Sequence, residues 1–419
     1  ATLHSLNRPQ TKIFYREGRH LVGDNRNFGI QRAAGKYICC LDADDKLKPT
    51  YLEKALFLLE NYHYDIVSPS VQLFGRSDKL FEVAARPTLE QITVWNQIST
   101  VAVYSKKFWE LTGGYHDWGL GRDYVSEDWD LWLRMLALGA RAINIPEPLM
   151  LYRIHGNSSL SHDAAVPSFE AQMAKIREFN KKLLKRANYR RSEQRNAAVI
   201  ELANPNLNLS TSYRKVSRKP SVLLALPFVI TGGADTVLLR LCEVLTANGF
   251  SLSVITSLPV EKSFGDNTPR YEAISKEIYH LCEFLEQDQR RNFLFYLIES
   301  RKIDVLFLAG STFTYELLPE IKRKFPHVKV VDQLFNELGH MESNRKYASC
   351  IDHHVVANQV IRSALLERGE RGENIDVIVH GVDVQDEFNP NNVDEKPLLS
   401  GALLPANKFF VSFIGRFSE

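Results

Sequence analysis

The sequence is poor in the features that mark membrane-spanning, disulfide-stabilised and nucleic-acid-binding proteins. Its 419 residues contain no apolar run of the roughly 18 residues that a transmembrane helix needs. The five cysteines are odd in number and show no C-x-x-C spacing, so we expect reduced thiols that fill the core. A formal net charge of +2 is too small to steer the whole molecule toward nucleic acid. No secretory signal opens the sequence, and the reduced thiols predict a cytoplasmic protein.

The composition that remains is that of a globular protein, with 44% hydrophobic and 24% charged residues and enough length for two or three domains. Residues 1–160 and 219–419 each alternate short apolar strands with amphipathic helices, which predicts an α/β fold in both. The sequence starts at Ala1 and stops in "FFVSFIGRFSE", a strand and a turn. We expect both ends to be cut edges of a longer protein.

The segment between these two zones, residues 161–218, is rich in Lys and Arg. The stretch "AKIREFNKKLLKRANYRRSEQRN" predicts a basic amphipathic helix, and "NPNLNLSTSYRKVSRKP" predicts a polar linker. One interpretation is a solvated helix and linker. The other is a surface for anionic lipid, which would give peripheral contact at the inner face of the membrane.

Three carboxylates crowd the end of a predicted buried strand in "CCLDADDKLKP". Asp42 and Asp44 are two residues apart, so in an extended strand they would point to the same side. Because like charges repel, such a cluster suits a divalent cation, Mg²⁺ or Mn²⁺, bridging to a diphosphate at the carboxyl end of the strand. The alternative is an ordinary Asp-rich turn before a helix.

Other motifs accompany "LDADD" in a fixed order: "RNFGIQRAAG" before it, then "GGY" and "EDWDLWLRMLALG" after it. In this combination residues 11–160 resemble the family 2 inverting glycosyltransferases, which have the GT-A fold. The resemblance implies transfer of a sugar from a nucleotide-sugar to a glycan or a lipid-linked saccharide, with Mn²⁺ or Mg²⁺ as cofactor. The first strands of that family, which hold the nucleobase, have no counterpart here, so we expect a truncated GT-A domain.

The same resemblance assigns roles to the acidic residues. Asp42 and Asp44 match the metal-binding D-x-D pair, and Asp45 would assist through hydrogen bonds or water. Asp128 matches the catalytic base, a carboxylate that takes the proton of the acceptor hydroxyl. Glu127 would contact the acceptor or orient Asp128. The alternative is that Glu127 and Asp128 only favour a helix N-terminus through the helix dipole.

Five further residues carry two interpretations each. His155 in "YRIHGNS" is either a metal ligand, as in some members of the family, or structural. Arg26 and Asn27 could approach the nucleotide, but Asn27 could equally cap the helix that follows. Trp129 and Trp132 are either helix core or platforms for a sugar ring.

The second zone opens with "VLLALPFVITGGADTVLLRLCEVLTANG", two glycines between a strand and a helix. With "IDHHVVANQ" and "GVDVQDEFNP", this region resembles the amino-terminal, Rossmann-like domain of the family 4 glycosyltransferases, which have the GT-B fold. The resemblance implies that Gly232 and Gly233 face the donor phosphates and that Arg416 binds phosphate; an ordinary tight turn is the alternative for the glycines. The family's histidine after the strand "IDVLFLAGST" has no counterpart. Three residues remain as unranked alternatives: Asp332, His340 and His354.

Together these patterns predict a tandem bifunctional glycosyltransferase: a GT-A domain over 1–160, a basic helical linker over 161–218 and a GT-B amino-terminal domain over 219–419. Its role would be to build a surface polysaccharide or O-antigen. A non-catalytic glycan-binding or scaffold protein made of degenerate transferase domains is one rival. A nucleotide-dependent oxidoreductase is another, which is disfavoured because the loop lacks G-x-G-x-x-G.

Overall fold

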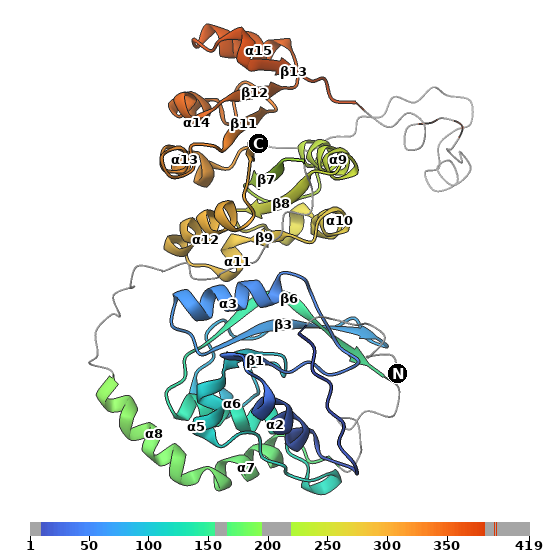
Figure 1. Ribbon diagram of the computed structural model, residues 1–419, viewed down its shortest axis with the longest axis vertical. Helices are drawn as coiled ribbons and strands as arrows, with labels where there is room; N and C mark the ends of the chain where they lie inside the picture. The colour runs from blue at the N-terminus through green and yellow to red at the C-terminus, as the bar shows by residue number, and fades with distance from the viewer. Residues whose placement is uncertain (1–9, 156–165, 195–218, 382–388, 390, 392–419) are drawn as a thin grey trace, which may run out of the picture.

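The chain folds into two α/β bodies, each built on its own sheet (Figure 1). The computed structural model describes residues 10–155, 166–194 and 219–381, together with 389 and 391. The first sheet is mixed and the second is parallel, which confirms the predicted α/β class with two sheets.

The first sheet has the strand order β1-β5-β3-β6-β2, with β4 paired to the outer part of β3. Its central strands β3 and β6 run parallel, and the other pairs are antiparallel. The strands are β1 (Tyr37–Cys39), β2 (Lys46–Leu47), β3 (Ile66–Gly75), β4 (Leu80–Phe81), β5 (Val103–Ser105) and β6 (Ala142–Ile154).

Helices cover both faces of this sheet because apolar residues on its strands alternate between the faces. Val67 packs in one core with Phe57 of α3, whereas its neighbour Ile66 packs in another core with Trp132 of α6. Figure 1 shows α3 on the side of the second body and α2, α5 and α6 on the opposite side. The helices are α2 (Val22–Arg32), α3 (Tyr51–Asn61), α4 (Leu89–Ile92), α5 (Lys106–Thr112) and α6 (Glu127–Ala137).

The basic segment after the first body is partly packed rather than free. It forms two helices, α7 (Phe169–Phe179) and α8 (Lys181–Gln194), which meet at Asn180. Met173 and Ile176 enter the core of the first body, and Asn180 donates to Asp130 at 2.8 Å. The expected linker therefore begins with helices that bury an apolar face against α6, and residues 195–218 lie outside the described part of the chain. Among the described residues, no helix has the length and apolar character to cross a membrane.

The second sheet has seven parallel strands in the order β9-β8-β7-β10-β11-β12-β13. This is the order of the doubly wound Rossmann sheet with one further strand at its end. The order reverses between β7 and β10, where such folds bind ligands. The strands are β7 (Ser221–Leu226), β8 (Ser251–Thr256), β9 (Ile278–His280), β10 (Val305–Leu308), β11 (Lys329–Leu334), β12 (His353–Val356) and β13 (Ile375–Val377).

Helices follow the strands of the second sheet, as the alternating sequence pattern predicts. The first of them, α9, starts directly after the Gly232–Gly233 pair, and Gly249 lies beyond its end with a φ of +81°. That left-handed conformation explains a glycine at this place. The helices are α9 (Gly233–Ala247), α10 (Thr268–Ile274), α11 (Leu281–Phe284), α12 (Gln287–Ser300), α13 (Thr312–Lys324), α14 (Met341–Lys346) and α15 (Gln359–Glu367).

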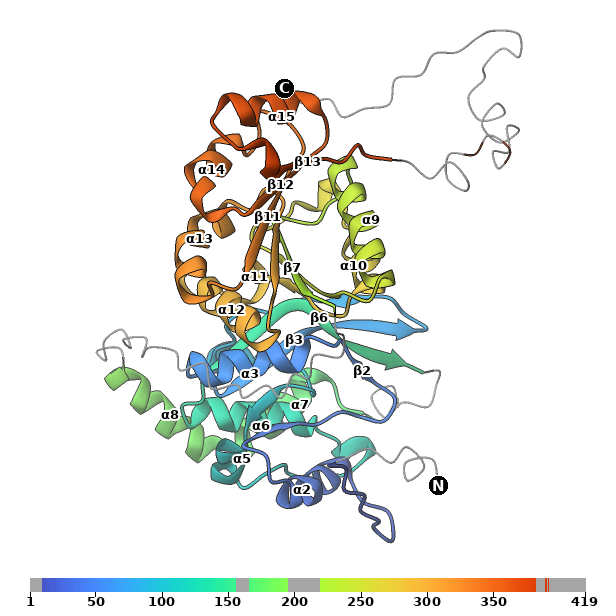
Figure 2. The same ribbon diagram turned by 45° about the horizontal axis from the view of Figure 1, so that its top comes forward.

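A continuous core joins the two bodies through α3, which lies between the sheets (Figures 1 and 2). Phe57 of α3 meets Phe293 of α12 with ring centroids 4.8 Å apart. Beside them, Arg301 donates to Glu53 of α3 at 2.7 Å, and Tyr279 donates to the same carboxylate at 2.6 Å. Buried apolar and ionic contacts therefore hold the bodies together as one unit.

Candidate active site of the first body

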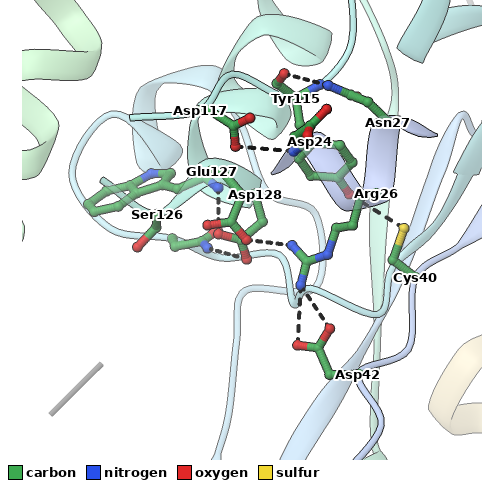
Figure 3. A network of polar contacts seen from close by, with 12 residues as sticks. Asp24, Arg26, Asn27, Cys40, Asp42, Tyr115, Asp117, Ser126, Glu127 and Asp128 are labelled. Carbon is green, nitrogen blue, oxygen red and sulfur yellow. Dashed lines mark hydrogen bonds and ion pairs between the residues drawn. The ribbon is translucent and has the colours of Figure 1, made fainter. Parts of the chain in front are cut away.

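The candidate site lies where β1 ends, beside the first turn of α6 and one face of α2 (Figure 3). Arg26 of α2 stands at its centre, with a side chain only 8% exposed. Its Nη1 donates to Glu127 Oε1 at 2.5 Å, and its Nη2 lies 3.2 Å from both carboxylate oxygens of Asp42. One guanidinium thus ties the aspartate-rich turn to the start of α6, where Glu127 lies 101 positions after Arg26 in the sequence.

Asp128 is nearly buried, with 6% of its surface exposed. Its Oδ1 accepts the backbone N–H of Trp129 at 2.7 Å, and Asn96 Nδ2 lies 3.5 Å from its Oδ2. Burial, with the neighbouring Glu127 carboxylate, raises the pKa of Asp128 to about 7, although the Arg26 charge opposes the rise. A carboxylate that titrates near neutral pH is suited to take a proton from a hydroxyl.

The aspartates after β1 occupy a turn, and the expectation that Asp42 and Asp44 point to the same side is wrong. The N–H of Asp45 donates to the Asp42 carbonyl at 3.2 Å, which closes the turn. Asp42 therefore faces Arg26, whereas Asp44 faces His155, with 2.7 Å between Oδ2 and Nε2. The strand ends earlier than expected, at Cys39, so strand alternation does not apply to these residues.

A metal ion was predicted at Asp42, Asp44 and His155. The described residues hold no group of three or more His, Cys, Asp or Glu side chains placed to bind one. Asp44 and His155 nevertheless form a half-exposed carboxylate–imidazole pair, and the hydrogen bond from His155 lowers the pKa of Asp44. Such donors suit a divalent cation in chemical type. Asp42, the third predicted ligand, pairs with Arg26 instead.

Asp45 differs from its two neighbours because it is buried, with 8% exposure. Its Oδ1 accepts the N–H of Arg153 at 2.9 Å, but its Oδ2 has no hydrogen-bond partner among the described residues. Burial raises the pKa of Asp45 to about 6. An unpartnered buried carboxylate oxygen next to the Asp44–His155 pair fits a place where water or a bound group completes the site.

Asn27 lies in the middle of α2, so the interpretation that it caps the following helix is wrong. Its Oδ1 accepts from Tyr115 N at 2.8 Å and Trp109 Nε1 at 3.1 Å, and its Nδ2 donates to the Tyr115 carbonyl. These bonds use the amide to fix the "GGY" loop. Trp129 and Trp132 are fully buried, which settles both as core rather than sugar platforms.

Two residues near the site were missed by the sequence analysis. Arg153 donates its Nε–H to the Asp44 carbonyl at 3.0 Å, besides its backbone bond to Asp45. It stands two residues before His155, so strand alternation could have placed both on one face. Asn96, which approaches Asp128, comes from a loop with no pattern that marks it.

The second body has its own cavity, of about 670 Å³, at the carboxyl ends of β7, β10 and β11. Gly232 and Gly233 line it at the start of α9, and so does His340. The His340 ring packs directly against Gly310, since a Cβ at Gly310 would lie 2.6 Å from His340 Nε2. This is the point where the strand order reverses, the usual ligand site of such a sheet. That the glycines face donor phosphates stays a prediction.

The other candidates in the second body do not line this cavity. Asp332 and His354 are fully buried, and Asn344 bonds to both. Arg416 lies outside the described residues.

Comparison with known proteins finds similarity to glycosyltransferases. Residues 2–129 match the family model described as glycosyl transferase family 2. An uncharacterized glycosyltransferase of Haemophilus influenzae is 30% identical over 152 residues, 32% of this chain and 45% of the relative. The O-antigen biosynthesis glycosyltransferase WbnJ of Escherichia coli is 26% identical over 159 residues, 37% of this chain and 61% of the relative.

Residues 2–129, in the N-terminal part of the chain, are therefore similar to glycosyl transferase family 2. The chain spans about half the length of the relatives it matches. Among solved structures, a lipopolysaccharide outer core galactosyltransferase, WaaB, aligns with 40% of this chain and 47% of its own, at 14% identity and a TM-score of 0.31. So low a score establishes no shared fold, and the Rossmann-like class of the second body rests on its strand order.

Proposed function

We propose that the first body is an inverting glycosyltransferase in which Asp128 is the catalytic base. The observation that carries this proposal is a nearly buried carboxylate with a pKa of about 7, joined through Glu127 and Arg26 to the aspartate-rich turn. In a single displacement at the anomeric carbon, the carboxylate takes the acceptor proton on the face opposite the leaving diphosphate.

The other residues serve the leaving group. Asp44 and His155 would hold Mn²⁺ or Mg²⁺, with Asp42 as the third candidate ligand and Asp45 supporting the turn. Such an ion supplies charge stabilisation for the departing diphosphate. Arg26 Nε is buried and has no partner among the described residues, and a phosphate oxygen is an acceptor of the kind that would satisfy it. Glu127 holds the guanidinium in place.

For the second body we propose a second transferase activity of the GT-B type, with ligand bound in the cavity at Gly232 and Gly233. The E. coli relative is named for O-antigen biosynthesis, which supports O-antigen or surface polysaccharide assembly as the shared task, and we propose a lipid-linked saccharide as the acceptor. A lipid-linked acceptor would place the work at the inner face of the membrane, where α8 presents Lys and Arg residues.

The test is the stereochemistry of the transfer. The full chain is incubated with Mn²⁺, α-linked nucleotide-sugars and a lipid-linked saccharide, and the new linkage is read by NMR. We expect a β-linked product that requires the divalent ion and is absent in the Asp128→Asn variant. A product made by the first body with retained configuration, or full activity in EDTA, would refute the proposal.

A further inference from the structure

The junction between the two bodies contains a second cavity, of about 640 Å³, which neither proposed active site uses. The first body contributes β3, β6 and the segment between β2 and α3, and the second contributes α10, α11 and the ends of β8 and β9. Figure 2 shows β3 and β6 of the first body below α10 and α11 of the second. We call this cavity the junction cleft.

A buried hydroxyl in the junction cleft has no partner in the protein. Ser70 of β3 is 1% exposed and lines the cleft, and its Oγ has no hydrogen-bond partner among the described residues. The register between β3 and β6 shifts on both sides of Ser70, which pairs with Pro148. Such bulges redirect a side chain. A buried hydroxyl is normally satisfied, so this one indicates a place for a ligand's polar group.

The other polar groups of the cleft disfavour an anion. Lys48 forms an ion pair with Glu272 at 3.0 Å. Burial, and to a smaller extent the charge of the nearby Glu147, raises the pKa of Glu283. Carboxylates outnumber the lysine and would repel a phosphate or diphosphate. They accept hydrogen bonds from hydroxyl groups well. The acidic lining residues are Glu82, Glu147, Asp266, Glu272 and Glu283.

Apolar and hydroxyl side chains complete the walls. Pro146, Pro148 and Leu149 of the first body face Leu258 and Ile278 of the second across the cleft. Apolar surface beside scattered acceptors matches the C–H faces and hydroxyl edges of a pyranose ring. The hydroxyl-bearing lining residues are Thr50, Ser70, Thr256 and Thr268.

We propose that the junction cleft binds a neutral saccharide segment of the glycan on which the two bodies act. The proposal rests on the proposed function for the identity of that glycan. Its location supports it: Lys48 follows the aspartate-rich turn through β2, while Val229 lies on a loop whose neighbours, Phe228 and Ile230, line the second-body cavity. The cleft therefore adjoins segments that belong to both sites.

The test is binding of saccharides by the full chain. The protein is applied to an array of neutral and acidic bacterial oligosaccharides, and the best neutral one is titrated by calorimetry. Ser70→Ala should weaken it about fivefold, since a hydrogen bond is lost. Leu258→Trp, at a position 48% exposed, should weaken it more than tenfold by filling the cleft. Leu111→Trp, 60% exposed on α5, is the control and should bind as the unmodified chain does.

Three results would overturn the proposal. The first is that no neutral saccharide binds, and the second is equal saccharide affinity in Leu258→Trp and Leu111→Trp. The third is that the acidic cleft binds a polycation, spermine, in place of saccharides. The proposed function is tested separately with Asp128→Asn, because Asp128 lies outside the cleft. That variant should keep saccharide affinity even where transfer is lost, so a failure of the base and a failure of the cleft are distinguishable.

Discussion

Arg26 is the residue whose removal tests the organisation of the first site, and Arg26→Met is the substitution that removes it. Methionine keeps the packing of the stem but removes the charge. Glu127, 13% exposed, then loses its partner, whereas Asp42, 46% exposed, regains water. Removing one partner of a buried ion pair costs about 3–5 kcal/mol. We expect the lower end, about 3 kcal/mol, because one of the two carboxylates is half exposed.

The same variant changes the pH dependence of the reaction. The positive charge of Arg26 lowers the pKa of Asp128, which burial has already raised to about 7. Without that charge the pKa rises further, so the base is ionised only at higher pH. The acidic limb of kcat/KM against pH should move upward by about one unit. The assays are sugar transfer from pH 5.5 to 9.5 and urea unfolding.

Arg32→Met is the matched control, because Arg32 lies on the same helix α2 and is exposed. It should leave the acidic limb in place and change the free energy of unfolding by less than about 0.5 kcal/mol. The role given to Arg26 is refuted if the acidic limb of kcat/KM lies at the same pH in both variants. It is also refuted if Arg26→Met has the same free energy of unfolding as Arg32→Met.

Three further predictions follow from single contacts. Asp44→Asn should weaken Mn²⁺ binding in the presence of UDP at least about tenfold by calorimetry, with the exposed Asp78→Asn as control; equal affinities would remove Asp44 from the metal site. Arg301→Met should lower the free energy of unfolding by about 3 kcal/mol, because Glu53 and Glu277 lose their partner at the junction of the bodies; a loss as small as that of Arg323→Met, a side chain 79% exposed, would contradict this. Asn27→Ala should cost about 2–3 kcal/mol and leave the donor KM unchanged, compared with Gln31→Ala on the same helix; a raised donor KM would instead favour nucleotide contact.

Much of the fold could be predicted because local pattern and tertiary structure agree. The apolar runs of the second half appear as β7, β8, β10, β11 and β12, and the two glycines stand at the start of α9 as expected. Helix α7 is different, since its charges suggested a helix that faces solvent or lipid, whereas Met173 and Ile176 pack into the core of the first body. Periodicity predicts a helix, but it does not say which surface receives it.

The sequence names candidate residues, whose roles stay predictions, but it does not show the geometry that joins them. The motifs named Asp42, Asp44 and Asp128, yet the sequence does not show that Arg26 bridges Asp42 to Glu127, a residue 101 positions after Arg26. That bond depends on how α2 packs beside α6. The turn at Asp42 likewise depends on β1 ending early, which strand alternation does not reveal.

The most direct test of the central claim is the rate of sugar transfer by Asp128→Asn. At pH 8.5, above the pKa of the carboxyl, removal of a general base should reduce kcat by about 10²–10⁴-fold while the protein remains folded. Asp123→Asn is the control, since that side chain is 84% exposed and its ion pair with Lys175 is long, at 3.9 Å. It should keep full activity. If Asp128→Asn transfers sugar at a rate within about threefold of the unmodified chain, Asp128 is not the base.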